Sequence, residues 1–282
     1  MKNPSILSAN PKLPAIEKFK STSKINLGLW IKEKRPDGFH ELETIFFENE
    51  SFFDEIEIEL FDDNSQINVD FIQEDFKKVI PLKSNVAYQA ASLFFKALGV
   101  DAGCNIKINK RIPLQAGLGG GSSNAACVLK GLNKLFSYQL HETELLILAS
   151  KIGSDVPFFI KGKTCFGRGR GEIVNEIENN LKLEVKIIRI ENISISTKWA
   201  YEQIDGREFI ADRKTEINNL KLAMKNNDYD LFYKNIFNDF EKAIFSYFPA
   251  LIKERNKLFE EGYKACGLCG SGSALFGLRK SN

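Results

Sequence analysis

The feature that most constrains this 282-residue chain is the stretch at residues 113–126, which reads PLQAGLGGGSSNAA. Glycines accept positive φ without steric cost, so successive backbone N–H groups can point into one concavity. An apolar stripe at helical spacing follows, which predicts a helix over about 123–136: Ala125, Val128, Leu129, Leu132 and Phe136. The unpaired N–H groups and positive dipole end of that helix would face the same way. Together they predict a phosphate-binding loop.

The alternative is a flexible turn between a strand and a helix. A turn rarely needs G-L-G-G-G-S-S followed at once by a periodic helix, so phosphate binding is the better interpretation. The Walker A pattern is missing, and no run of βαβ units continues into a dinucleotide-binding fold. The H-R-D and D-F-G landmarks of protein kinases are also absent.

Composition excludes several classes of protein. Hydrophobic residues make up 43% and charged residues 27%, the balance of a soluble globular protein. The 39 basic and 37 acidic residues leave a net charge of only +2, too little to favour nucleic-acid binding. We expect no membrane span, because no stretch approaches about 18 apolar residues, and no signal peptide, because prolines interrupt the N-terminal apolar residues. A cytoplasmic protein with a loosely held N-terminal arm, residues 1–18, is expected.

The five cysteines are scattered, so a disulfide framework is not expected. Cys266 and Cys269 have the C-x-x-C spacing, but a zinc site would need a second pair or nearby histidines, and the only histidines are His40 and His141. We predict two small packing residues and no metal site of the protein's own.

Periodicity along the chain predicts a two-domain α+β protein. Strands are expected in an antiparallel, hairpin-rich sheet at 24–31, 41–47, 55–60, 67–71 and 104–113. Later strands are expected at 183–190 and around 269–278, with a strand or loop zone at 156–177. Helices are expected at 84–99, 123–136, 141–151, 215–226, 228–247 and 249–261. The predicted domains are residues 19–170, which contain the predicted phosphate-binding loop, and 171–282.

Three short motifs carry a family resemblance. They are KINL at residues 24–27, the glycine loop, and CGSGS at residues 269–273. In order and spacing they resemble the galactokinase, homoserine kinase, mevalonate kinase and phosphomevalonate kinase superfamily. The resemblance implies a two-domain kinase fold and ATP as phosphoryl donor.

Three further stretches narrow the resemblance. RPDGFHELET at 35–44, GSDVPFF at 153–159 and CFGRGRGEI at 165–173 are similar to segments of the 4-diphosphocytidyl-2-C-methyl-D-erythritol kinase family. Members of that family phosphorylate the 2-hydroxyl of 4-diphosphocytidyl-2-C-methyl-D-erythritol, a step in the methylerythritol phosphate route to isoprenoid precursors. The similarity spans roughly residues 23–277.

Phosphoryl transfer to an alcohol needs a carboxylate to accept the proton and cations to steady the phosphate oxygens. Asp155, in an apolar setting between Gly153 and Pro157, is the candidate base; taken alone it could instead cap a turn. Lys24, in an otherwise apolar run, is costly to bury without a partner, which a pair with Asp155 would provide. The resemblance assigns the catalytic lysine and aspartate to these two positions.

The resemblance also implies the ligand contacts. Phe39 would stack on the cytosine and His40 would bond its edge, with Tyr201 on the opposite face or in the core. Other substrate contacts would be Asn26, Gly270, Ser271 and Gly272. ATP contacts would be Pro113, Leu114, Gln115, Ala116, Gly117, Leu118, Gly119, Gly120, Gly121, Ser122 and Ser123, with Asn85 and Lys110 near the adenine or ribose. We expect Mg²⁺ to arrive with ATP and touch Ser122 or Ser123. A monomer or weak homodimer is expected.

Some residues depart from the family pattern. Phe39 stands where tyrosine is usual, Cys269 where serine or threonine is usual, and Asn124 where aspartate is common. Another kinase of the same superfamily, of the homoserine or mevalonate type, is the alternative within enzymes. A relative that binds nucleotide without turnover is less favoured, because Lys24 and Asp155 are both present, and the near-neutral charge and the glycine loop weigh against an RNA-binding protein.

Overall fold

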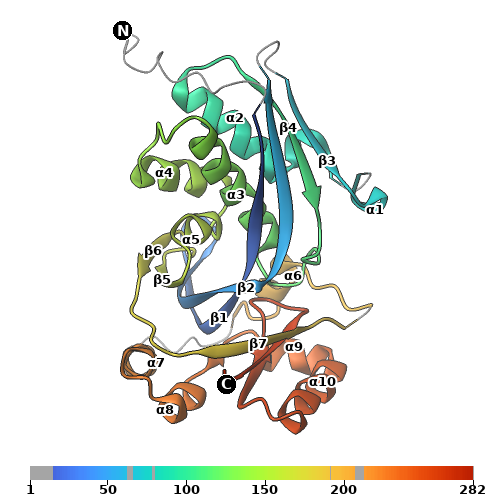
Figure 1. Ribbon diagram of the computed structural model, residues 1–282. Helices are drawn as coiled ribbons and strands as arrows, with labels where there is room; N and C mark the ends of the chain where they lie inside the picture. The colour runs from blue at the N-terminus through green and yellow to red at the C-terminus, as the bar shows by residue number, and fades with distance from the viewer. Residues whose placement is uncertain (1–14, 62–65, 78–79, 191, 207–212, 282) are drawn as a thin grey trace. The chain divides into compact units, whose positions relative to one another are not determined.

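The structure is a computed structural model that describes residues 15–61, 66–77, 80–190, 192–206 and 213–281. Its strands form two sheets (Figure 1). The strands, in chain order, are β1 Ala15–Lys34, β2 His40–Phe61, β3 Ile67–Phe71, β4 Gly103–Asn109, β5 Thr164–Arg168, β6 Ile173–Glu176, β7 Leu183–Ile188, β8 Phe237–Asn238, β9 Ala265–Leu268 and β10 Leu275–Lys280.

The helices vary from single turns to four turns and include one 3-10 turn at Leu82–Ser84. They are α1 Glu74–Lys77, α2 Val86–Leu98, α3 Gly120–Leu135, α4 Glu142–Ile152, α5 Val156–Lys161, α6 Thr197–Glu202, α7 Lys214–Asn226, α8 Tyr229–Lys234, α9 Glu241–Tyr247 and α10 Pro249–Glu260.

The larger sheet runs in the order β3-β4-β2-β1-β8, with β5 added on β2 and β6 on β5. It is mixed: β2 pairs with β4 and β5 antiparallel, whereas β3 pairs with β4 and β1 with β8 in parallel. The expected antiparallel sheet is therefore only partly right. The smaller sheet, β7-β10-β9, is antiparallel throughout.

The chain divides into two compact units, each made of three segments that are not consecutive in the sequence. Unit 1 holds residues 1–23, 52–112 and 120–160, and unit 2 holds 24–51, 113–119 and 161–282. β1 and β2 each pass from one unit into the other, and so does the glycine loop. The linear boundary at residue 170 remains a prediction, and this grouping by compactness differs from it. Of the predicted arm, residues 15–18 begin β1 and the rest lies outside the described residues.

The core of unit 1 lies between a strand pair and a helix. The β2–β4 register places Ile56 opposite Ile108 and Ile58 opposite Ile106, and these side chains, at alternate positions along each strand, are buried. Helix α3 packs closely on this layer at Gly131, where a Cβ would lie 2.7 Å from the Ile58 side chain. α2, α3 and α4 contact one another (Figure 1).

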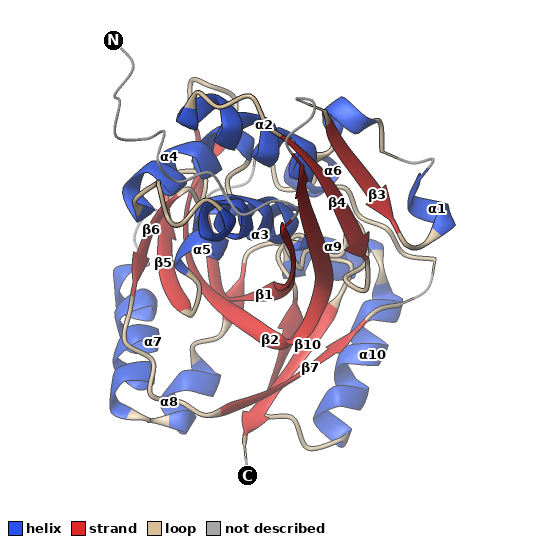
Figure 2. Cartoon of the chain, turned by 45° about the horizontal axis from the view of Figure 1, so that its top comes forward, coloured by secondary structure: helices blue, strands red, loops and turns tan. Residues whose placement is uncertain are grey.

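In unit 2, a separate apolar cluster forms the core. Its buried members come from β1, β2, α9, α10 and the smaller sheet, and include Leu29, Ile31, Leu42, Ile244, Leu251, Leu258, Leu268 and Leu275. α10 contacts α9, β9 and β10, whereas α7 and α8 contact each other (Figure 2).

Several predicted elements are confirmed, with their caps. Helix α2 begins after Asn85, whose side chain accepts a hydrogen bond from the Ala87 N–H, and ends at Gly99 with φ +66°. β3 has the predicted bounds, and α4, α7 and α10 match within about one residue at each end. α3 starts at Gly120, three residues before the predicted start.

Three expectations are wrong. The strands expected at 41–47 and 55–60 are one strand, β2, because its backbone stays extended through the polar residues between them. The helix expected at 228–247 is broken by β8, which pairs with β1 at Gly28 and Leu29. The strand or loop zone at 156–177 opens with helix α5.

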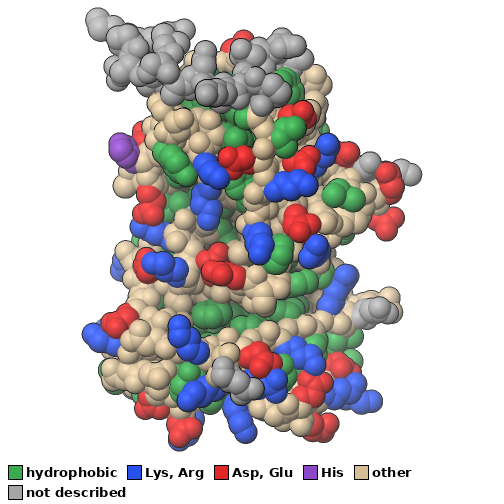
Figure 3. Space-filling model, viewed as in Figure 1, with side chains coloured by type: hydrophobic (Ala, Val, Ile, Leu, Met, Phe, Trp, Pro, Cys, Tyr) green, Lys and Arg blue, Asp and Glu red, His purple; other side chains and the backbone are tan. Residues whose placement is uncertain are grey.

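The surface agrees with the near-zero net charge. On the face seen in Figure 3, lysine and arginine side chains are interspersed with aspartate and glutamate. Among the described residues, no helix is long and apolar enough to cross a membrane.

The five cysteines are free thiols, and four of them are buried; Cys266 is half-buried. Burial raises the pKa of Cys266 and Cys269 to about 12. Because of these raised pKa values, the C-x-x-C pair lacks the low pKa of a redox dithiol. Within the described part of the chain, no group of three or more His, Cys, Asp or Glu side chains could hold a metal ion.

We predict slow thiol chemistry in the folded protein. With Ellman's reagent at pH 8, Cys266 should react first and the four buried thiols far more slowly, whereas all five should react in guanidinium chloride. Rapid reaction of two thiols, or loss of both to a disulfide under mild oxidant, would contradict this.

Candidate active site

The glycine loop depends on close approach between backbones. Within unit 2, a Cβ at Gly117 would lie only 1.6 Å from the Cys269 carbonyl oxygen, so no other residue fits there. Gly117 and Gly119 have φ of +74° and +70°, the left-handed region that favours glycine. Gln115 adopts φ +53°, and its side chain accepts a hydrogen bond from Ser194.

The loop residues of unit 2 meet both other sequence motifs. The Lys24 N–H donates to the Leu118 carbonyl at 3.0 Å, and the Ala274 N–H donates to that of Ala116 at 3.3 Å. A Cβ at Gly270 would lie 3.0 Å from the Gly117 carbonyl oxygen. Three motifs that are far apart in sequence are thus brought together.

The third motif is held by side chains from outside it. Asn238 of β8 donates to the carbonyls of Leu268 and Gly270, at 3.0 and 2.8 Å. The hydroxyl of Ser271 lies 3.2 Å from that of Thr197. The Gly272 N–H donates to the Cys269 carbonyl, at 2.8 Å.

Lys24 is buried on β1, with its ammonium group in a polar setting. Its Nζ donates to Asn26 Oδ1 at 2.7 Å, and Asn26 Nδ2 donates to Thr44 Oγ1 at 2.8 Å. Thr44 in turn donates to the Gly28 carbonyl. A Cβ at Gly270 would lie 3.0 Å from Lys24 Nζ, so this lysine faces the third motif.

The unit 1 part of the loop is the start of helix α3. Ser122 is half-buried, whereas Ser123 is buried and accepts a hydrogen bond from Ser21 at 2.8 Å. Of the two predicted magnesium contacts, Ser122 is therefore the better placed to meet a ligand. A Cβ at Gly121 would lie 3.8 Å from Val86, so the start of α2 adjoins this helix end.

Lys110 lies beside the same helix end. A Cβ at Gly120 would be 2.9 Å from Lys110 Nζ. Burial lowers the pKa of Lys110, and its ion pair with the Asp54 carboxylate partly offsets that effect. An ammonium group at a glycine-rich helix N-terminus suits a phosphate or nucleotide ligand.

Asp155 lies in the turn that directly precedes α5 and is half-buried. The turn adjoins the start of α3, because a Cβ at Gly153 would lie 4.0 Å from Ser122 Oγ. A carboxylate at this place can accept a proton near a bound phosphate. Lys24 and Asp155 belong to different units, so their pairing stays a prediction.

The predicted substrate loop joins β1 to β2. His40 is buried, and its Nε2 lies 3.0 Å from Asp205 Oδ1. Burial lowers the pKa of His40, with Asp205 opposing, which favours the neutral imidazole. Tyr201 stacks on His40 at 5.0 Å between ring centroids, and it forms a T-shaped pair with Phe240.

Phe39 projects from this loop with 52% of its surface exposed. The Arg170 guanidinium lies 4.8 Å from the ring centroid. An exposed aromatic ring held by a cation on one side offers a stacking surface for a planar ligand.

Sequence reasoning missed Asp54, which is fully buried and binds Lys110. A signal was present: the alternation that buries Ile56, Ile58 and Leu60 places Asp54 on the same inward face. Asn238 and Thr44 were also missed, and nothing in the sequence marks them.

Comparison with known proteins agrees with this geometry. Residues 85–163 match the family described as GHMP kinases N terminal domain, and residues 220–282 match GHMP kinases C terminal. A protein of Chlorobium phaeobacteroides named 4-diphosphocytidyl-2-C-methyl-D-erythritol kinase is 37% identical over 92% of this chain and 87% of its own length. One of the same name from Pelodictyon phaeoclathratiforme is 38% identical over equal shares.

Solved structures share the fold. A crystal structure of 4-(cytidine 5'-diphospho)-2C-methyl-D-erythritol kinase matches with a TM-score of 0.74 and 30% identity, covering 93% of this chain and 90% of that one. Homoserine kinase from Cytophaga hutchinsonii has a TM-score of 0.79 at 18% identity, covering 97% and 88%. The latter likeness concerns the fold alone. The two-domain α+β kinase fold expected from the sequence is confirmed, and the chain belongs to the GHMP kinases, among the 4-diphosphocytidyl-2-C-methyl-D-erythritol kinases.

Proposed function

We propose that the protein transfers the γ-phosphoryl group of ATP to the 2-hydroxyl of 4-diphosphocytidyl-2-C-methyl-D-erythritol, a step toward isoprenoid precursors. The observation that carries the choice of acceptor is the 37% identity to a kinase of that name over 92% of this chain. The convergence of the glycine loop with the first and third motifs supports phosphoryl transfer.

The reaction needs few groups. The hydroxyl oxygen attacks the γ-phosphorus, the bond from that phosphorus to the bridging oxygen breaks, and ADP leaves. Asp155 takes the hydroxyl proton, and Lys24, held by Asn26, steadies Asp155 and the phosphate oxygens.

ATP would lie on the loop at residues 113–123. The packing at Gly120 supports this, because a Cβ there would overlap the Ile112 side chain at 2.8 Å and Lys110 Nζ at 2.9 Å, so the ammonium group lies directly against the helix N-terminus. Mg²⁺ would come with ATP and bind Ser122 and phosphate oxygens, supplying charge neutralisation. Lys110 and Asn85 would lie near the nucleotide.

The cytosine would stack on Phe39 and form a hydrogen bond with His40. Tyr201 would hold the His40 imidazole in place by stacking on it. Asn26 and the third motif, Gly270 to Gly272, would face the methylerythritol end. We also propose a cytoplasmic location and a monomer or weak homodimer.

The first test is ADP release with Mg-ATP and three acceptors: the cytidyl substrate, homoserine and mevalonate. We expect turnover only with the cytidyl substrate. Turnover of another alcohol would support kinase activity but contradict the proposed acceptor. Nucleotide binding without turnover of any acceptor would contradict the proposal that the protein is an enzyme.

Asp155→Asn should lower kcat by roughly 10²- to 10⁴-fold, because the amide cannot accept the proton. ATP affinity should be nearly intact. The matched control is Asp228→Asn, since Asp228 also precedes a short helix, where it caps the Leu231 N–H. Equal, small effects of both changes would mean that Asp155 only caps its turn.

Phe39→Ala should raise KM for the cytidyl substrate roughly 5- to 150-fold, since base stacking contributes about 1–3 kcal/mol. KM for ATP should not change, and Phe39→Tyr should retain the wild-type value. Tyr138→Ala, at another exposed aromatic, is the control. An equal rise in KM for ATP would rule out cytosine stacking.

A further inference from the structure

Asp54 is a fully buried carboxylate for which the reaction itself has no use. It lies in β2 on the face that packs inward. A buried carboxylate is costly unless donors satisfy it. The hydrogen-bond donors around Asp54 therefore indicate its role.

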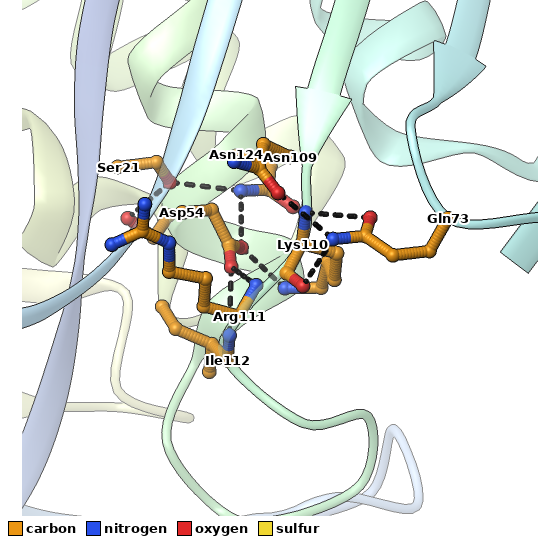
Figure 4. A network of polar contacts seen from close by, with 9 residues as sticks. Ser21, Asp54, Gln73, Asn109, Lys110, Arg111, Ile112 and Asn124 are labelled. Carbon is orange, nitrogen blue, oxygen red and sulfur yellow. Dashed lines mark hydrogen bonds and ion pairs between the residues drawn. The ribbon is translucent and has the colours of Figure 1, made fainter.

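Four donors surround the Asp54 carboxylate (Figure 4). Oδ1 accepts the backbone N–H groups of Arg111 and Ile112, both at 2.7 Å. Oδ2 accepts Asn124 Nδ2 at 2.9 Å and also binds Lys110 Nζ. Both oxygens are thus fully used.

These donors lie on both sides of the glycine loop. Ile112 is the last residue before Pro113, and Asn124 lies in the first turn of α3. One carboxylate therefore ties the chain entering the loop to the helix leaving it. Fixing both ends reduces the conformations that the loop must give up when it binds a ligand.

Lys110 is fixed at both its backbone and its ammonium group. Its N–H donates to Gln73 Oε1 and its carbonyl accepts from Gln73 Nε2, each at 3.0 Å. Asp54 holds the ammonium group at the place where a Cβ on Gly120 would lie 2.9 Å away. The charge is therefore aimed at the helix N-terminus before any ligand arrives.

We propose that Asp54 is a positioning residue for the nucleotide: it holds the Lys110 ammonium beside Gly120 and clamps both ends of the glycine loop. The proposal rests on ATP being the phosphoryl donor. Asp54 itself touches neither nucleotide nor acceptor.

The test is Asp54→Asn, with calorimetric binding of Mg-ADP and separate KM values for both substrates. The amide oxygen can still accept hydrogen bonds from the two backbone N–H groups, but the amide NH₂ cannot accept the hydrogen bonds that Lys110 Nζ and Asn124 Nδ2 donate to the carboxylate. Hydrogen bonds to charged groups are worth enough to expect about a 10- to 100-fold rise in the Kd of Mg-ADP and the KM of ATP. KM for the alcohol should stay at the wild-type value.

The matched control is Glu57→Gln on the same strand. Glu57 pairs with Lys107 of β4, as Asp54 pairs with Lys110, but its side chain is partly exposed. It should leave both KM values unchanged. Parallel rises in both KM values for Asp54→Asn, or no change in Mg-ADP affinity, would overturn the proposal.

A double mutant identifies the route of the effect. If Asp54 acts through Lys110, adding Asp54→Asn to Lys110→Met should weaken Mg-ADP binding far less than it does in the wild type; additive losses would overturn that route. Should Asp54→Asn not fold, Asn124→Ala removes the donor on the helix side, and unchanged Mg-ADP affinity there would count against the clamp. A wild type that binds Mg-ADP but does not phosphorylate the cytidyl alcohol would overturn the proposed function and leave this inference standing.

Discussion

The contact on which the rest depends is the approach of the Gly117 backbone to the Cys269 carbonyl. It brings the glycine loop against the third motif, and only glycine allows it. The loop presents N–H groups rather than charged side chains, so its affinity for an anion depends on how firmly neighbouring segments hold it. Each neighbouring motif accordingly supplies bonds to the backbone.

Each unit fixes its own part of the loop by a different means. In unit 2 the bonds run between backbones, from Lys24 to Leu118 and from Ala274 to Ala116. In unit 1 a single buried carboxylate, that of Asp54, accepts hydrogen bonds from Ile112 before the loop and from Asn124 after it. The candidate catalytic groups are divided in the same way, Lys24 in unit 2 and Asp155 in unit 1.

Local signals in the sequence were enough for much of the fold. Asn85 and Gly99 bound α2 because capping depends on residues next to one another. The break at β8 could not be predicted, since it depends on pairing with β1, some 200 residues earlier. Likewise, two predicted strands are one because nothing local marks whether an extended backbone ends between them.

The candidate site shows the same division. The three motifs could be identified, and the structure brings them together through bonds that no local pattern encodes. Asp54 could have been found from strand alternation, which places it inward. Its four donors could not, because they depend on how β2, the end of β4 and α3 pack.

The most direct measurement is a crystal structure with Mg²⁺, a non-hydrolysable ATP analogue and the cytidyl alcohol. We expect oxygens of the β- and γ-phosphates to accept hydrogen bonds from the N–H groups of the glycine loop and the start of α3. We also expect the Asp155 carboxylate within hydrogen-bond reach of the 2-hydroxyl, with Lys24 beside it. A triphosphate bound away from the loop, or an acceptor hydroxyl out of reach of Asp155, would contradict this mechanism.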